Sequence, residues 1–179
     1  KLIAISQYGC RDTTSKPLEI YPMPKANFTL SDTAMCLRNN RFTFTNSSSI
    51  SYNSLTYQWQ LGDGVISSLT SLNHSYNSHG VYQVQLIANS NKSCSDTIRK
   101  TVEVYPMPRA RFTMNDSTQC LRGNQVNFIN QSSIAYNSLS YLWRFGNGDS
   151  SLQNNAIYTY PNYGIYTLSW NLSQWCERM

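Results

Sequence analysis

The residues best suited to acid–base or metal chemistry are one turn aspartate and two histidines. Asp63 stands in Gly62-Asp63-Gly64, and His74 and His79 are the only histidines among 179 residues. Asp63 could act as a catalytic acid or a Ca²⁺ ligand, but in a hairpin it is a residue that tolerates left-handed φ. The sequence has only nine acidic residues, which argues against paired-carboxylate catalysis. We therefore interpret Asp63 as a turn residue and keep Ca²⁺ binding as the alternative.

A second copy of this stretch changes the same positions. The pattern of residues 57–64 returns at residues 141–148, where Asn147 replaces the turn aspartate, and Tyr158 and Tyr163 replace the two histidines. A Zn²⁺ site would need more ligands nearby, and the sequence has no Cys-x2-Cys pair. The serines have no His-rich or acidic cluster beside them to act as a base. The sequence predicts no catalytic residue, no cofactor, no metal site and no enzyme activity, and it predicts His74 as a packed residue.

The composition limits the kinds of partner. Charged residues make up 13% of the chain, the net charge is +5, and the arginines are spread along the sequence. A nucleic-acid-binding domain would have a denser basic face, so we expect no nucleic-acid partner. No apolar run approaches the ~18 residues of a membrane helix, so we expect a chain that does not span a membrane. A surface of Ser, Thr, Asn and Gln suits exposed faces of β-sheets and is common in secreted proteins.

Short residue patterns recur along the sequence at one constant distance. This repeat offset equals the distance in sequence from Tyr21 to Tyr105. The landmarks are Tyr-Pro-Met-Pro at 21–24 and 105–108, Cys-Leu-Arg at 36–38 and 120–122, Asn-Ser-Leu at 53–55 and 137–139, and Trp59 with Trp143. Such an offset over a whole unit indicates tandem repeats. We predict that residues 1–22 are the C-terminal part of a first repeat, 23–106 a complete second repeat, and 107–179 a third that is shortened or divergent at its C-terminal end. Because residues 2–10 match residues 86–94, we expect a fragment of a longer chain.

Short alternating segments predict β-strands throughout. In the second repeat we expect strands near residues 27–30, 41–45, 57–61, 81–89 and 97–104, with short edge strands within 65–72 and a polar loop at 31–40. Gly62 and Gly64 mark a hairpin turn, because such turns need positive φ. No window has helical periodicity.

Aromatic residues and glycines recur in both full copies and predict the core. The predicted structural core residues are Trp59, Tyr76, Gly80, Tyr82, Trp143, Tyr160, Gly164 and Tyr166. Tyr82 and Tyr166 each follow a glycine by two residues and precede an inward residue by two, which is the arrangement of a tyrosine corner. Seven or so short strands in a repeat with regular turn signals argue for a β-sandwich. The expected fold is all-β, with tandem immunoglobulin-like β-sandwiches in an elongated array.

These motifs resemble the PKD (polycystic kidney disease) domain family. The resemblance rests on Tyr-x-Trp-x-Leu-Gly-Asp-Gly at 57–64, His-x-Tyr at 74–76 and Gly-x-Tyr-x-Val-x-Leu at 80–86, and in tandem copies it covers nearly all of the chain. The sequence departs from the family at Leu61, where Phe is usual, and at Asn147. The copies with cysteines resemble PKD-like repeats of very large Bacteroidota cell-surface proteins, which include gliding and adhesion proteins exported by the type IX route.

The five cysteines form two classes. Cys10, Cys94 and Cys176 follow the sixth strand of a repeat, whereas Cys36 and Cys120 lie between the first and second strands. In an oxidising compartment this spacing implies disulfides. Three periodic pairings are open: Cys36–Cys94 with Cys120–Cys176 within a repeat, Cys10–Cys36 with Cys94–Cys120 along the sequence, or Cys36–Cys176 across a junction.

An immunoglobulin-like topology ranks these pairings. It places the two loops at opposite ends of a repeat, about 26 Å apart for an eight-residue strand. A disulfide needs Cα atoms within ~7 Å, which disfavours the first two pairings. Since the lower end of one unit meets the upper end of the next, the array permits Cys36–Cys176.

Four hydroxyl residues follow an aspartate and precede Thr, Ala or Ile. Thr13, Thr33, Thr97 and Ser117 resemble the Bacteroidota O-glycosylation motif, in which Asp precedes Ser or Thr and then a small or apolar residue. The alternative is an aspartate that ends a turn before a strand and is repeated by duplication. We keep all four as O-glycosylation candidates.

Basic residues occur near the first strand of each full copy. Arg109 and Arg111 alternate in the third copy, and Lys25 is near the equivalent place in the second. They could bind an anionic partner, but charges on edge strands more often block unwanted sheet pairing.

Taken together, these features predict a non-enzymatic structural or adhesive segment of a secreted or cell-surface protein. It would act as an extended spacer and a multivalent surface, with other repeats of the same chain, surface glycans or proteins as partners. The resemblance implies export by the type IX route. The alternatives are a carbohydrate- or protein-binding accessory module of an exported hydrolase, or a subunit of an extracellular assembly.

Overall fold

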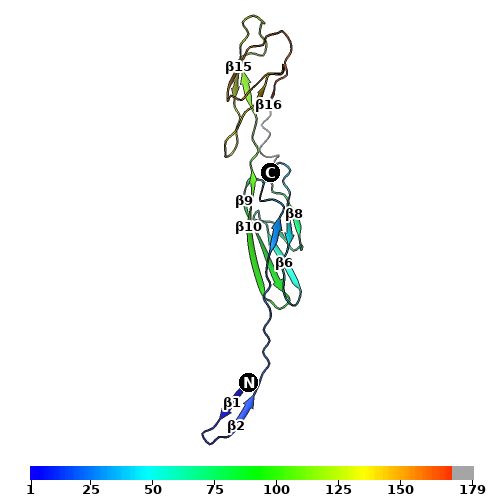
Figure 1. The fold of residues 1–179 in the computed structure, drawn as a ribbon, viewed down its shortest axis with the longest axis vertical. Coiled ribbons are helices and arrows are strands. Elements are labelled where there is room, and N and C mark those ends of the chain that lie inside the picture. The colour runs from blue at the N-terminus through cyan, green and yellow to red at the C-terminus, as the bar shows by residue number, and fades with distance from the viewer. Residues whose placement is uncertain (171–179) are drawn as a thin grey trace.

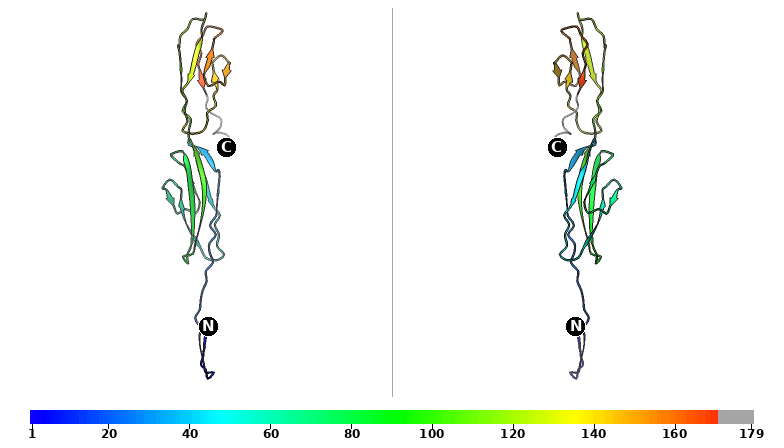
Figure 2. Two further views of the ribbon diagram at one scale, coloured as in Figure 1. Left: turned by 90° about the vertical axis from the view of Figure 1, so that its left-hand side faces the viewer. Right: turned by 90° about the vertical axis from the view of Figure 1, so that its right-hand side faces the viewer.

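The computed structural model describes residues 1–170, and the regular structure of these residues consists of strands alone. Three groups of strands follow one another along the long axis of the molecule (Figure 1, Figure 2). The first group is a hairpin of β1 (Leu2–Ile5) and β2 (Arg11–Thr14). An extended segment without regular structure, residues 15–24, leads from this hairpin to the second group.

The second group, which we call the second unit, is a sandwich of two sheets. Its strands are β3 (Phe28–Leu30), β4 (Ala34–Cys36), β5 (Phe42–Asn46), β6 (Leu55–Gln60), β7 (Ile66–Ser67), β8 (Leu72–His74), β9 (Gly80–Ser90) and β10 (Ser95–Tyr105). One sheet has the order β3-β5-β8, and the other has the order β4-β10-β9-β6-β7. The pairing of β10 with β4 is parallel, whereas β10 with β9 and β6 with β9 are antiparallel.

Alternate side chains of these strands point inward and form the core of the second unit. The fully buried members are Phe28, Phe42, Phe44, Trp59, Leu61, Val84, Leu86, Val102 and Val104. The ring centroid of Trp59 lies 5.0 Å from that of Phe28 and 6.0 Å from that of Phe44. Such edge-to-face and tilted contacts add to the burial of apolar area.

The third group, the third unit, repeats this arrangement with shorter strands. Its strands are β11 (Phe112–Met114), β12 (Val126–Asn130), β13 (Trp143–Arg144), β14 (Ser150–Ser151), β15 (Ala156–Tyr158) and β16 (Ser169–Trp170). The sheets have the orders β11-β12-β15 and β14-β13-β16. The buried core consists of Val126, Phe128, Trp143, Phe145 and Ala156. The chain therefore has an all-β fold of the immunoglobulin-like β-sandwich type.

The expectation of a plain loop at residues 31–40 was wrong, because this segment contains β4. Thr33 O accepts a hydrogen bond from the Glu103 N–H at 2.9 Å, and the Leu37 N–H donates to Tyr105 O at 2.9 Å. Strand β10 therefore supplies the partner that makes residues 34–36 a strand. Three residues are too few for alternation to appear in the sequence. The other strands expected in the second repeat are present.

A short junction joins the second and third units. It contains Pro106 and Pro108, whose rings restrict φ. The Tyr136 hydroxyl of the third unit donates a hydrogen bond to Val104 O at 3.3 Å, and its ring lies 5.8 Å from the His79 ring. Burial, with Glu103 nearby, raises the pKa of Tyr136. The two units are thus in contact beside the proline junction.

None of the structure within residues 1–170 forms a helix of the length and apolarity that a membrane crossing requires.

Candidate functional site

At the turn between β6 and β7, Asp63 and His74 lie side by side. The His74 Nε2 lies 2.7 Å from Asp63 Oδ2, and the Val65 N–H donates to Asp63 Oδ1 at 3.1 Å. Gly62 and Gly64 make the turn with φ of 86° and 92°, a region that favours glycine. Burial opposes ionisation of Asp63, but the hydrogen bonds with His74 and Val65 outweigh it and lower its pKa. The turn therefore holds an ionised carboxylate against the histidine.

The corresponding turn of the third unit makes the same contact with other groups. Asn147 Nδ2 donates to Tyr158 Oη at 2.7 Å and to Asp149 Oδ2 at 3.1 Å, and the Tyr158 hydroxyl donates to the Asp149 carboxylate. The hydrogen bond with Asp149 raises the pKa of Tyr158. Sequence reasoning treated the turn residue and His74 separately and missed this pair. The signal was present, because both positions change together between the copies.

The two carboxylate oxygens of Asp63 are already engaged in hydrogen bonds within the protein. Both of its carboxylate oxygens already accept hydrogen bonds from His74 or Val65. Residues 1–170 hold no group of three His, Cys, Asp or Glu side chains that could bind a metal ion. The arrangement is that of a turn closed by its own hydrogen bonds.

Tyr76 connects the two sheets of the second unit. Its buried hydroxyl donates to Leu61 O at 2.7 Å, and burial raises its pKa. Asn40 is also buried: its Nδ2 donates to Leu37 O and Tyr76 O, and its Oδ1 accepts from the Tyr76 N–H. Buried polar groups of this kind are costly unless they are paired. The sequence analysis named Tyr76 but missed Asn40.

The third unit repeats this connection. Asn124 bonds to Leu121 O and to both backbone groups of Tyr160, whose hydroxyl donates to Phe145 O at 3.0 Å. Asn40 and Asn124 are separated by the repeat offset, and this recurrence was the signal that could have found both asparagines.

Tyr82 and Tyr166 have the hydrogen bond that defines a tyrosine corner. The Tyr82 hydroxyl donates to Ser78 O at 2.7 Å, and the Tyr166 hydroxyl donates to Asn162 O at 2.8 Å. The Tyr82 ring is stacked on Tyr76 with centroids 3.9 Å apart. A Cβ atom at the predicted core residue Gly80 would lie 3.9 Å from the Tyr82 ring.

The other predicted core residues pack in the same way in both units. A Cβ atom at Gly164 would lie 3.5 Å from the Tyr166 ring. The indole Nε1 of Trp59 donates to Leu69 O at 2.8 Å, and that of Trp143 donates to Gln153 O at 2.9 Å. Both tryptophans are therefore buried with their one donor satisfied.

Strand β10 lies between Cys36 and Cys94 in the second unit. Cys10, Cys94 and Cys120 are free, so neither the pairing within a repeat nor the pairing along the sequence is formed by them. Cys36 lies beside Tyr105, at the junction end of β10, whereas Cys94 precedes the opposite end of this 11-residue strand. At ~3.4 Å per residue these ends are about 34 Å apart. Cys176 lies outside the described residues.

The candidate O-glycosylation residues are all on the surface. Thr13, Thr33, Thr97 and Ser117 are exposed, as are the edge residues Arg109, Arg111 and Lys25. Lys25 and Arg109 form equivalent backbone bridges with Ser49 and Ser133.

Comparison with known proteins places the second unit among known domains. Residues 21–105 match the family model described as PKD domain. The PKD1 domain of Vibrio anguillarum Epp is 29% identical over 46% of this chain and 93% of its own, with a TM-score of 0.41. The PKD1 domain from the Vibrio cholerae metalloprotease PrtV is 30% identical over 48% of this chain and 98% of its own, with a TM-score of 0.40. A carbohydrate-binding module of the β-sandwich superfamily is 14% identical over 83% of each chain, with a TM-score of 0.44.

Proposed function

The chain belongs to the PKD domain family through residues 21–105, and from this we propose that it is a non-enzymatic structural segment that acts as a semi-rigid spacer. Its repeats, at residues 1–22, 23–106 and 107–179, would be strung end to end. PKD domains are typical of extracellular proteins, and we place the segment in a secreted or cell-surface protein. Export by a Bacteroidota type IX route and a role in gliding or adhesion rest on the resemblance of the repeats alone.

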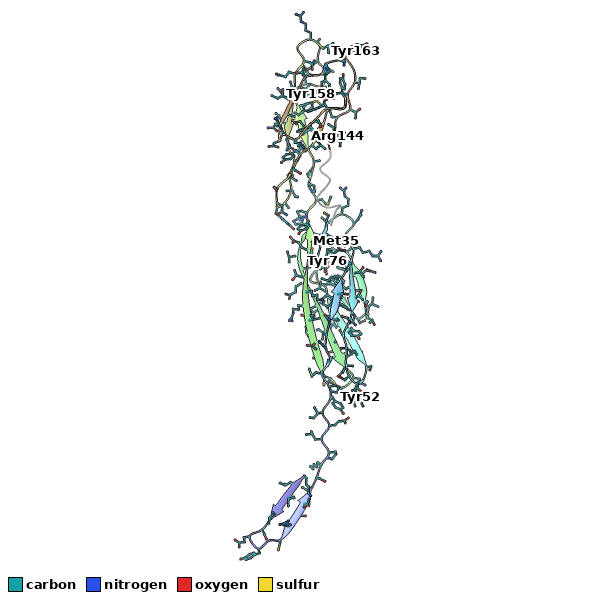
Figure 3. All side chains as sticks on the ribbon, viewed as in Figure 1. Met35, Tyr52, Tyr76, Arg144, Tyr158 and Tyr163 are labelled. Carbon is teal, nitrogen blue, oxygen red and sulfur yellow. The ribbon has the colours of Figure 1, made fainter. Side chains whose placement is uncertain are left out.

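The contact between the second and third units is the observation that carries this proposal. Tyr136 bonds to Val104 O directly beside Pro106 and Pro108, so the junction is short, restricted in φ and braced by a side chain. Tyr52 occupies the same position in the second unit, at the end that faces the extended segment, and is 60% exposed (Figure 3). A spacer of this kind stays extended because its neighbouring units hold a fixed orientation relative to one another.

A disulfide across the junction would stiffen the spacer further. The position of Cys36 next to Tyr105, together with free Cys10, Cys94 and Cys120, supports pairing of Cys36 with Cys176. A non-reducing peptide map should join Cys36 to Cys176. A map that joins Cys36 to Cys94 would contradict this pairing.

Glycans or proteins could bind along such a segment, and repetition would then add weak contacts into avidity. An accessory glycan-binding module would present exposed aromatic residues in a row on one sheet face. The strongly exposed tyrosines of residues 1–170, Tyr8, Tyr52 and Tyr163, instead lie in three separate loops. We therefore favour the spacer over the accessory module.

Backbone ¹⁵N relaxation tests the fixed orientation of the units. We expect residues 25–105 and 109–170 to report one common anisotropic tumbling in the unchanged chain. Tyr136→Ala should separate their apparent correlation times, because it removes the contact with Val104 and His79. Tyr52→Ala is the matched control and should change nothing. Independent tumbling of the two units in the unchanged chain would contradict the spacer proposal.

A further inference from the structure

An Asn-Gly pair lies in the turn between β13 and β14 of the third unit. Asn147 is the one asparagine of the 179-residue chain that a glycine follows. Asn147 and Gly148 are both exposed, and a Cβ atom at Gly148 would meet no atom of residues 1–170 within 4 Å. The backbone nitrogen of Gly148 therefore has no side chain of its own residue to shield it, and water reaches the turn.

A following glycine allows asparagine to rearrange without an enzyme. The Gly148 N–H gives its proton to hydroxide, and the nitrogen forms a new bond to Cγ of Asn147. The Cγ–Nδ2 bond then breaks, and Nδ2 takes a proton from water and leaves as ammonia. Water next opens the cyclic imide at either carbonyl carbon. One opening gives aspartate, and the other gives isoaspartate, in which the main chain runs through the side-chain carbons.

The turn polarises the group that would be attacked. The Asp149 N–H donates a hydrogen bond to Asn147 Oδ1 at 3.3 Å. Addition of a nitrogen to Cγ moves negative charge onto this oxygen, and a donor that already points at the oxygen stabilises that charge. The turn thus holds a nucleophile, a carbonyl carbon and a hydrogen-bond donor within three consecutive residues.

A carboxylate at position 147 would lose the contacts that the amide makes. Asn147 Nδ2 donates to Tyr158 Oη at 2.7 Å and to Asp149 Oδ2 at 3.1 Å. An ionised carboxylate has no proton to donate, and it would face the Asp149 carboxylate as a like charge. We propose that Asn147 is a site of spontaneous deamidation and that the new carboxylate opens this turn. The modification goes beyond the spacer role and does not depend on it.

The same turn of the second unit has a different composition. Its Asp63-Gly64 pair forms a cyclic imide only by loss of water from a protonated carboxyl group. Burial opposes ionisation of Asp63, but the hydrogen bond with His74 lowers its pKa, so the group is an ionised carboxylate at neutral pH. Val65 stands where the third unit has Asp149. We therefore expect the modification in the third unit and not at the equivalent place in the second.

Peptide mapping of the full chain after storage at mildly alkaline pH tests the chemistry. Aspartate and isoaspartate should accumulate faster at position 147 than at Asn137, which is exposed but precedes Ser138. Asn147→Gln should abolish both products at this position, because its longer side chain would have to close a larger ring. Deamidation at Asn147 that is no faster than at Asn137 would overturn the proposed site.

Hydrogen exchange tests the effect on the turn, which the Phe145 N–H closes by donating to Asp149 O at 3.0 Å. Asn147→Asp reproduces one product and should speed exchange of this N–H, because the turn opens locally. Asn147→Asp/Asp149→Val keeps a single carboxylate, to which Tyr158 can donate, and should exchange as slowly as the unchanged chain.

The second unit of the same chain is the internal reference, and its exchange should be equal in all these proteins. Unchanged exchange of the Phe145 N–H in Asn147→Asp would overturn the opening of the turn. Equally fast exchange in Asn147→Asp and in Asn147→Asp/Asp149→Val would overturn the role of the two like charges.

Discussion

At Tyr76, one hydroxyl group holds together the two sheets of the second unit. It reaches Leu61 O at the end of β6 while the ring packs between Phe42 and Tyr82. Tyr82 also makes one hydrogen bond from its hydroxyl, but to the exposed Ser78 O four residues away. The two tyrosines thus differ mainly in the burial of the bond that each one makes.

Tyr76→Phe should lower the free energy of unfolding of the second unit by about 1–3 kcal/mol, because it leaves a buried carbonyl without its donor. Tyr82→Phe should cost less, about 0.5–1.5 kcal/mol, because water can replace the lost partner. Urea denaturation followed by tryptophan fluorescence measures both values. Equal losses in the two variants would contradict the connecting role of Tyr76.

Asp63 gives the second unit a defined dependence on pH. Its pKa is lowered in the fold, so the stabilisation is complete above its ordinary value of 3.8 and is lost as the pH falls through the lowered value. Asp63→Asn should remove that acid-side loss while costing less than about 1 kcal/mol at neutral pH, because the pair is partly exposed.

Thermal denaturation at several pH values checks this expectation, with Asp12→Asn in the first hairpin as the control. An unchanged pH profile in Asp63→Asn would mean that the pair with His74 contributes nothing to folding.

Individual residues were predictable where packing or turn geometry repeats. Trp59, Gly62 and Tyr76 persist at the repeat offset, and each has a structural role in both units. The pair of Asp63 with His74 was not predicted, because its partners are 11 residues apart and only the fold brings β8 under the turn. In the third unit Asn147 and Tyr158 take these two positions, and a hydrogen bond again joins the turn to the following strand.

Among the structural elements, the turn between β6 and β7 is restricted in conformation by its two glycines. Both Gly62 and Gly64 have positive φ, but their surroundings differ. A Cβ atom at Gly62 would lie 2.9 Å from Gln83 O of β9, whereas one at Gly64 would meet no atom within 4 Å. Gly146 repeats the close approach with Thr167 O at 2.6 Å.

Gly62→Ala should therefore destabilise the second unit by several kcal/mol, since it combines strained φ with a backbone collision. Gly64→Ala carries only the strain, about 1–2 kcal/mol. Chemical denaturation compares the two variants directly. If Gly62→Ala were no worse than Gly64→Ala, the close approach of the turn to β9 would be in error.

The strands were predictable where alternation runs over several residues, as in β5, β6 and β9. Strand β4 was not, because a three-residue strand exists only through its partner β10. In the third unit, residues 118–120 occupy the position of β4 in the repeat, but they form no strand within residues 1–170. Tertiary pairing, which no local pattern encodes, decides both cases.

At the scale of the whole molecule, the repeat offset predicted successive sandwiches, and the structure has two packed cores in succession along one axis (Figure 2). The contact of Tyr136 with Val104 could not be predicted, because it depends on how one unit meets the next. The spacer proposal rests on that contact and on the prolines beside it.

Small-angle X-ray scattering tests the extended form of the chain most directly. A compact 179-residue protein would have a radius of gyration of about 16 Å. We expect a value well above this, with a pair-distance distribution skewed to long distances. A radius of gyration close to the compact value, with a symmetric distribution, would contradict a spacer built of units placed end to end.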